Sequence, residues 1–178
     1  IQRRGGRGTS ARTKRCLVSF TLRMGLIVTR SASEGEAEFG LADVDVAPGR
    51  IVYTQLLNAR GGIEADLTMT RLNEDRYLLV TAAFTLTHVE AWLRDHRSPG
   101  EHVVVTDATD AYAMLNLQGP NARALLAAVT DADVSHAAFP YLQARTIDIG
   151  YQQALAARVS YVGELGWELY LPAEQCLD

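Results

Sequence analysis

The sequence is poor in the residues that build disulfide frameworks and metal sites. It contains only two cysteines, Cys16 and Cys176, which is too few for a disulfide-stapled fold. Neither lies in a Cys-x-x-Cys motif or a Cys/His cluster, so no metal site is predicted. Arg23 interrupts the longest apolar stretch near the start, which leaves no run of membrane-spanning length. No Gly-x-Gly-x-x-Gly fingerprint follows a strand there either, which argues against dinucleotide binding through that motif.

Lysine is also scarce, since one Lys stands against sixteen Arg. The 178 residues carry a formal net charge of −4, and this charge is unevenly distributed. The first 30 residues hold eight basic side chains and no acidic one, which leaves nine basic and 21 acidic side chains in the remainder. An acidic body of this kind is unfavourable for nucleic-acid binding. The basic start is typical of a mitochondrial transit peptide or of a nucleic-acid-binding arm, and its pattern leaves both readings open.

Composition divides the chain into two segments. Residues 1–40 are predicted to be a basic N-terminal arm that is disordered or non-homologous, with 17–29 able to form a short strand or helix. Residues 41–178 carry regular patterns and are predicted to form one domain. With 48% apolar residues overall, the chain can bury a sizeable core.

The patterns predict an α+β fold with mostly antiparallel sheet and two main helices. Alternating or β-rich runs separated by turns predict strands at 51–57, from 63 onward, 77–81, 102–106, 112–117, 147–149, 155–159 and 167–171.

Two stretches carry helix signals. Apolar residues at helical spacing predict a helix over 86–96, with Thr87 and Glu90 forming its capping box. The segment 118–122, Gln-Gly-Pro-Asn-Ala, predicts the start of a second helix.

The stretch 53–70 is the centre of the predicted site. It reads as strand, turn, strand, with glycines in the turn that can adopt positive φ. Because side chains alternate along a strand, Asp66, Thr68 and Thr70 share one face. One acid beside hydroxyl groups suits a wall that faces a ligand, although a solvated sheet face has the same pattern.

These residues carry a family resemblance. Tyr53, the glycines of the turn, Asp66-Leu67 and the run 71–81 resemble the folate-binding aminomethyltransferase family. That family includes the glycine cleavage T-protein and the C-terminal folate-binding regions of dimethylglycine and sarcosine dehydrogenases. Ala65 stands where T-proteins usually have a second acid, so the sequence of this motif is closer to the dehydrogenase branch. The resemblance extends from about Leu41 to the end of the chain.

The resemblance implies part of an aminomethyltransferase folate-binding domain over 41–178. The implied function is to bind tetrahydrofolate and to capture a one-carbon unit, as aminomethyl or iminium, in a dimethylglycine or sarcosine dehydrogenase-like protein. Folate and a methylated amine or its iminium product are the implied partners, without nucleic acid or membrane. FAD is implied only for a flavin dehydrogenase domain upstream in the full-length protein. The implied location is the bacterial cytoplasm or the mitochondrial matrix.

Two other readings remain open. A T-protein proper is the close alternative to the dehydrogenase-like protein. An inactive fragment or interaction module that keeps only the fold is the second.

The resemblance also assigns roles to single residues. Asp66 is the expected catalytic acid beside the pterin ring, where it orients a folate nitrogen and accepts its proton. The segment 158–169 is similar to the family pattern Arg-Thr-Gly-Tyr-Thr-Gly-Glu-x-Gly-Phe/Tyr-Glu, which makes Glu168 the carboxylate that binds the pterin edge. Tyr161 is expected to stack on the folate, and Tyr53 and Thr68 are expected to line its wall.

Overall fold

Two antiparallel sheets form the body of the molecule. The computed structural model describes residues 17–20, 23–30, 45–97, 99–100 and 102–175. Their strands form two five-stranded sheets in which every pairing is antiparallel. The predicted α+β class, with mostly antiparallel sheet and two main helices, is therefore confirmed.

Sheet 1 has the strand order β3-β4-β5-β2-β6. Its members are β3 (Ile51–Leu57), β4 (Ile63–Arg71), β5 (Arg76–Ala82), β2 (Arg23–Arg30) and β6 (Val103–Asp107). Between β5 and β6 the chain forms the short helix η1 (Ala83–Thr85) and the helix α1 (Leu86–Asp95).

Sheet 2 has the order β1-β7-β10-β9-β8. Its members are β1 (Leu17–Phe20), β7 (Tyr112–Gln118), β10 (Gly166–Pro172), β9 (Gln152–Ala157) and β8 (Ala144–Ile149). The remaining helices are η2 (Thr109–Ala111), α2 (Ala122–Ala127) and η3 (Ala173–Gln175).

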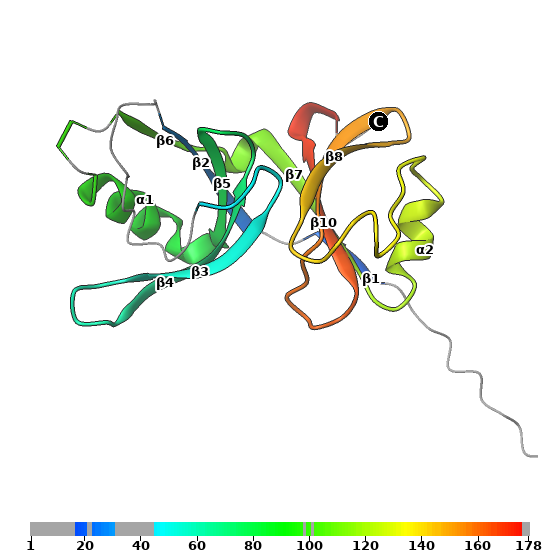
Figure 1. Cartoon of the computed structure of the whole chain (residues 1–178), viewed down its shortest axis with the longest axis horizontal. Coiled ribbons are helices and arrows are strands. Elements are labelled where there is room, and N and C mark those ends of the chain that lie inside the picture. The colour runs from blue at the N-terminus through cyan, green and yellow to red at the C-terminus, as the bar shows by residue number, and fades with distance from the viewer. Residues whose placement is uncertain (1–16, 21–22, 31–44, 98, 101, 176–178) are drawn as a thin grey trace, which may run out of the picture.

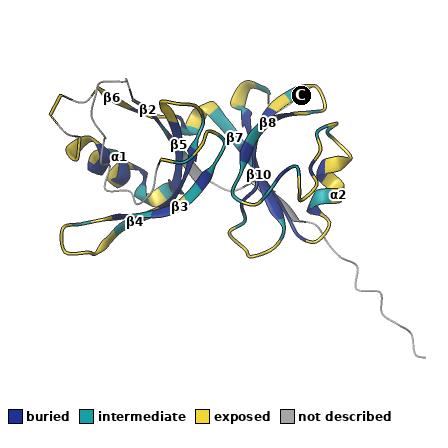
Figure 2. Cartoon of the chain, in the orientation of Figure 1, coloured by how far each residue is buried: buried dark blue, intermediate teal, exposed yellow. Residues whose placement is uncertain are grey.

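The layers follow the order helix, sheet, sheet, helix (Figure 1). Helix α1 packs on the outer face of sheet 1, and α2 packs on the outer face of sheet 2. A third apolar cluster fills the space between the sheets and joins Ile51, Leu78 and Val80 of sheet 1 to Met114 and Tyr170 of sheet 2. Burial is accordingly concentrated on the strands, while the tip of the β3–β4 hairpin is exposed (Figure 2).

Backbone hydrogen bonds also join the two sheets. Ile51 N donates to Leu142 O over 2.9 Å, and Ala144 N donates to Gly49 O over 2.7 Å. Gly49 has a φ of +82°, and a Cβ at this position would lie 3.0 Å from Ala144 O. Glycine is therefore required here both for its backbone conformation and for the close approach of the two segments.

The start of helix α1 differs from the sequence-based expectation. Thr85 occupies the N-cap position without a side-chain cap bond, and Thr87 lies inside the helix. The predicted capping box of Thr87 and Glu90 is therefore wrong. Glu90 instead accepts a hydrogen bond from Arg94 over 2.7 Å, and the Thr85 hydroxyl bonds to the carbonyl of Ala82.

Strands β1 and β2 fall within the first 40 residues. Strand β2 lies between β5 and β6, and its Leu26 and Val28 are 0% and 2% exposed. The proposed boundary at residue 40 stays a prediction, because 1–16, 21–22 and 31–40 lie outside the described residues.

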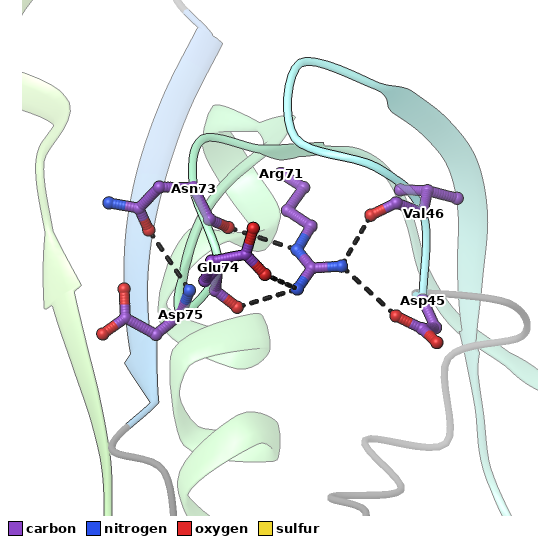
Figure 3. Close-up of polar contacts among 6 residues, drawn as sticks. All are labelled: Asp45, Val46, Arg71, Asn73, Glu74 and Asp75. Atoms are coloured by element: carbon purple, nitrogen blue, oxygen red, sulfur yellow. Dashed lines mark hydrogen bonds and ion pairs between the residues drawn. The ribbon is translucent and has the colours of Figure 1, made fainter.

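Arg71 joins the segment before β3 to the turn after β4 through hydrogen bonds (Figure 3). Its guanidinium donates to the backbone carbonyls of Val46, Asn73 and Glu74 over 2.7, 3.1 and 2.9 Å. It also pairs with the carboxylates of Asp45 and Glu74, both at 3.2 Å. Those carboxylates are 98% and 86% exposed, whereas the Arg71 side chain is only 13% exposed. The carbonyl bonds should therefore hold this junction more than the ion pairs do.

We predict that Arg71→Ala destabilises the fold by about 2 kcal/mol, because several carbonyls lose a charged donor. Glu74→Gln should change the stability by less than about 0.5 kcal/mol, because it removes only an exposed ion pair. Urea unfolding of the two variants and the wild type measures both values. An equal loss in the two variants would mean that the ion pair, and not the carbonyl bonds, holds the junction.

The β3–β4 hairpin is tied to helix α1 through Glu64. Its carboxylate accepts a hydrogen bond from Asn58 Nδ2 over 2.8 Å and lies 2.9 Å from Nε2 of His88. Asn58 Oδ1 in turn accepts from the backbone N–H groups of Arg60 and Gly62 in the turn. The hydrogen bonds from Asn58 and then from His88 lower the pKa of Glu64 below its usual value.

The lowered pKa of Glu64 predicts a pH-dependent contribution to stability. This contribution is fully present above the usual glutamate pKa of 4.5 and is lost as the pH falls through the lower value of the folded state. Glu64→Gln should therefore be less stable than the wild type at neutral pH, and the difference should shrink well below pH 4.5. Urea midpoints at neutral pH and well below pH 4.5 measure this difference in stability. Glu174→Gln, which changes an exposed glutamate, is the control. A stability difference that does not depend on pH would contradict a stabilising role of the ionised Glu64 carboxylate.

Candidate functional site

One face of β4 turns toward the other sheet. Ala65, Leu67 and Met69 pack into the cluster under α1, so the alternate residues point to the opposite side. Thr68 and Thr70 lie directly across from Val80 and Leu78 of β5, which belong to the cluster between the sheets. The shared face of Asp66, Thr68 and Thr70 is thus the face toward sheet 2.

Two neighbouring strands hold Asp66. Tyr53 on β3 donates its hydroxyl hydrogen to Asp66 Oδ2 over 2.8 Å. The β4–β5 pairing ends at Leu67 and Thr81. The Thr81 hydroxyl donates to the backbone carbonyl of Asp66, the residue before Leu67, over 3.1 Å. Thr81 is also 2.8 Å from the Thr85 hydroxyl. The carboxylate is therefore oriented from β3 while its backbone is held from β5.

Exposure differs within this group. Asp66 is exposed, and Tyr53 is 59% exposed. Thr68, directly across from Tyr53, is 9% exposed and lies beneath them. The tyrosine and the acid are thus available to a ligand, while Thr68 forms part of the wall behind them.

Tyr161 lies near this pair. The hydrogen bond to Asp66 and the charge of that carboxylate raise the pKa of Tyr53 above its usual value. Desolvation and the electrostatic effect of Tyr161 add smaller contributions in the same direction. Tyr161 is 82% exposed and lies in the loop that joins β9 to β10. Tyr161 therefore adds a small electrostatic effect on Tyr53 from the loop before β10.

A buried polar cluster lies on the inner face of sheet 2. Glu168 is 1% exposed, and its Oε2 accepts a hydrogen bond of 2.6 Å from the Tyr170 hydroxyl. Trp167 and Leu169 face the cluster under α2, so Glu168 and Tyr170 face sheet 1. Glu168 lies directly across from Asn116 of β7. A carboxylate enclosed this deeply requires polar partners.

These two sets of polar residues lie on the faces by which the two sheets approach each other. The loop that carries Tyr161 leads into Gly166, the first residue of β10, two residues before Glu168. The structure therefore brings Tyr53, Asp66 and Thr68 together on sheet 1, and it places Glu168 on the inner face of sheet 2, after the loop that carries Tyr161.

Two histidines near helix α1 have partners within the protein. His88 is half-exposed and bonded to Glu64, as a satisfied surface histidine. His96 stacks on Trp92, with ring centroids 3.8 Å apart. Within the described ranges, no three His, Cys, Asp or Glu side chains gather as metal ligands. None of the helices described is long and apolar enough to cross a membrane.

Sequence reasoning missed the polar residues on β7. Met114, Asn116 and Gln118 share one face of this strand, and the two amides are only 7% and 5% exposed. Two amides at alternate positions of an apolar strand, just before the Gln-Gly-Pro junction, were the available signal. Thr81 offered no such signal, because its partner is a backbone carbonyl on another strand.

We predict that Tyr53 ionises above the ordinary tyrosine pKa of 10.0 because Asp66 disfavours the phenolate. Asp66→Asn should lower the Tyr53 pKa toward that value, and Tyr161→Phe should lower it less. NMR titration of ¹³Cζ-labelled tyrosine follows each phenol, with Tyr53→Phe identifying the signal. An unchanged Tyr53 titration in Asp66→Asn would contradict the hydrogen-bonded arrangement.

Comparison with known proteins identifies the family. The model of the GCVT N-terminal domain matches residues 36–178. The 4-methylaminobutanoate oxidase (formaldehyde-forming) of Paenarthrobacter nicotinovorans is 42% identical over 137 residues, covering 77% of this chain and 16% of the relative. Human mitochondrial sarcosine dehydrogenase is 37% identical over 153 residues, covering 76% of this chain and 16% of the relative. The chain thus spans about one sixth of the length of these relatives.

A solved structure shares the fold. The glycine cleavage system aminomethyltransferase T of Bartonella henselae superposes with a TM-score of 0.74 at 28% identity, over 91% of this chain and 43% of that one. The sequence motifs, the paired antiparallel sheets and the matched domain all indicate the same family. We conclude that this chain belongs to the aminomethyltransferase family, through its GCVT N-terminal domain.

Proposed function

We propose that this chain binds tetrahydrofolate and takes part in capturing a one-carbon unit, in a dimethylglycine or sarcosine dehydrogenase-like protein. The observation that carries the proposal is that the inner face of each sheet carries one hydrogen-bonded carboxylate. Asp66 is exposed and bonded to Tyr53, whereas Glu168 is buried and bonded to Tyr170. Family membership and the similarity to a sarcosine dehydrogenase support it.

Glu168 would bind the pterin edge. That edge presents an amino group and a ring N–H side by side, and one carboxylate can accept hydrogen bonds from both. The burial of Glu168 on the face between the sheets excludes water that would compete for these bonds. Tyr170, donating to Oε2 over 2.6 Å, would fix the orientation of the carboxylate.

Asp66 would act at the reacting nitrogen. Bound tetrahydrofolate supplies the nucleophilic nitrogens that take up the one-carbon unit. An exposed carboxylate beside them can orient a nitrogen and accept its proton. The bonds from Tyr53 and Thr81 hold Asp66 in place for this task. Tyr53 and Tyr161 would contact the flat ring system, and Thr68 would form the wall behind it.

The activity of the full-length protein is a further part of the proposal. Because the chain spans 16% of the oxidase and dehydrogenase relatives, oxidation of a methylated amine belongs to a flavin domain elsewhere in such a protein. The proposed location is the bacterial cytoplasm or the mitochondrial matrix. A T-protein is the second candidate, and the similarity to the aminomethyltransferase of Bartonella henselae favours it.

We predict that the chain binds tetrahydrofolate saturably in a calorimetric titration. Glu168→Gln should weaken binding by roughly tenfold to a hundredfold, because it loses a charged acceptor for two donors. Asp66→Asn should bind with nearly wild-type affinity, since its proposed role lies in proton transfer. Glu164→Gln, which changes an exposed glutamate in the loop just before β10, is the matched control.

The control variant should behave as the wild type. Circular dichroism would show that each variant retains the β-rich fold. Absence of binding by a folded wild-type chain would contradict the proposal and favour a module that keeps only the fold. Equal affinities of Glu168→Gln and the wild type would show that Glu168 does not bind the pterin edge.

A further inference from the structure

Three arginine side chains hold the loop between α2 and β8. Arg123 lies in α2, Arg145 lies in β8, and Arg158 follows β9. Each guanidinium group donates to one or two backbone carbonyls within 133–139 of this loop. Among the residues that the structure describes, none of the three arginines has a carboxylate within ion-pair distance. The loop is therefore held to sheet 2 by cations whose acceptors are neutral.

Arg158 is the most deeply buried of the three. It is 7% exposed, whereas Arg123 and Arg145 are half-buried. Its guanidinium donates to the carbonyl of Phe139 and, over 3.1 Å, to Nδ1 of His136. Burial, and then the positive charge of Arg123, lower the pKa of Arg158 below its usual value. A charge at such depth is costly unless an opposite charge lies beside it.

The acidic side chain of the loop does not supply that charge. Asp133 is exposed, and its carboxylate accepts a hydrogen bond from the backbone N–H of Ser135 over 2.8 Å. The hydrogen bonds of Ser135 are the main cause that lowers the pKa of Asp133, while Arg145 and then Arg123 contribute less. The surroundings of Arg158 therefore keep an excess of positive charge.

Two aromatic rings join the three arginines into one cluster. The Cζ atoms of Arg123 and Arg158 lie 5.2 and 5.7 Å from the ring centroid of Trp167. The Cζ of Arg145 lies 4.2 Å from the ring centroid of Phe139. Phe139 in turn packs edge-on against Trp167, with centroids 6.1 Å apart. These five side chains are called the arginine cluster below.

Three N–H donors of the arginine cluster have no acceptor among the described residues. They are Nε of Arg145, Nε of Arg158 and Nε1 of Trp167, and all three atoms are buried. A buried donor without an acceptor costs the desolvation of that group, so three in one cluster call for an acceptor. A water molecule could accept hydrogen bonds here, but only an anion would also offset the charge of Arg158.

We propose that the arginine cluster binds one small inorganic anion of the chloride class. Nε of Arg158 and Nε1 of Trp167 donate to it, and Arg145 supplies a third donor. A monatomic anion accepts hydrogen bonds from any direction, so it can serve donors of different side chains. Trp167 faces the cluster under α2, so this anion lies on the outer side of sheet 2, away from the face of Glu168. It offsets the charge of Arg158 and strengthens the attachment of the loop.

NMR of the indole N–H groups tests this in solution. The sequence has two tryptophans, and Trp92→Phe assigns their two signals. The unaltered chain is titrated with sodium chloride, while sodium gluconate, whose anion is too large for buried donors, keeps the ionic strength constant. The Trp167 signal should shift saturably and the Trp92 signal should not. A Trp167 signal that does not respond, or equal unsaturable shifts of both signals, would overturn the proposal.

Arginine variants test the donor set. Arg145→Gln should raise the half-saturating chloride concentration by roughly tenfold, because a charged donor is lost. Arg60→Gln, the same change at an exposed turn residue, is the matched control and should behave as the wild type. Circular dichroism would show that each variant is folded. A folded Arg145→Gln that binds chloride as the wild type does would contradict the donor set.

A crystal of the unaltered chain grown in sodium bromide gives a second measurement that needs no variant. We expect an anomalous bromide peak within hydrogen-bond distance of Nε of Arg158 and Nε1 of Trp167. A water molecule at this position, without anomalous signal, would overturn the proposal.

Discussion

The packing of the two sheets against each other is the contact on which the rest of the structure depends. Each sheet has a helix on its outer face and the other sheet on its inner face, so the strands have no fully solvated side. The apolar cluster around Ile51, Val80 and Tyr170 fills the shared interior, and the backbone bonds of 49–51 with 142–144 fix the approach. A polar side chain that is buried on an inner face must therefore be hydrogen-bonded.

The candidate site follows from this constraint. On sheet 1 the inner face changes from apolar residues to Thr68 and Asp66, and on sheet 2 it changes from Met114 to Asn116 and Glu168. The hydrogen bonds from Tyr53, Thr81 and neighbouring groups satisfy the polar atoms and also orient them. These hydrogen bonds thus fix the orientation of the side chains on which the proposed function depends. The exposed loop that carries Tyr161 leads into β10, the strand of Glu168.

Much of this arrangement could be predicted from the sequence, because period-two patterns determine which residues share a face. Strands β3 to β7, strand β10 and helix α1 lie close to their predicted ranges, whereas β8 and β9 each begin three residues earlier than predicted. Local patterns failed where a tertiary partner decides the outcome. Thr87 resembles a capping residue, but η1 lets the helix begin at Leu86. The hydrogen bond of Thr81 and the pairing of Asn116 with Glu168 join strands that are distant in sequence, so only the three-dimensional register reveals them.

The most direct measurement of the central claim is a crystal structure of this chain with tetrahydrofolate bound. We expect density for the pterin between the two sheets, with its amino edge on Glu168 and its reacting nitrogens beside Asp66. Tyr53 and Tyr161 should contact the ring system. A ligand bound on the outer face of either sheet, away from both carboxylates, would contradict the account.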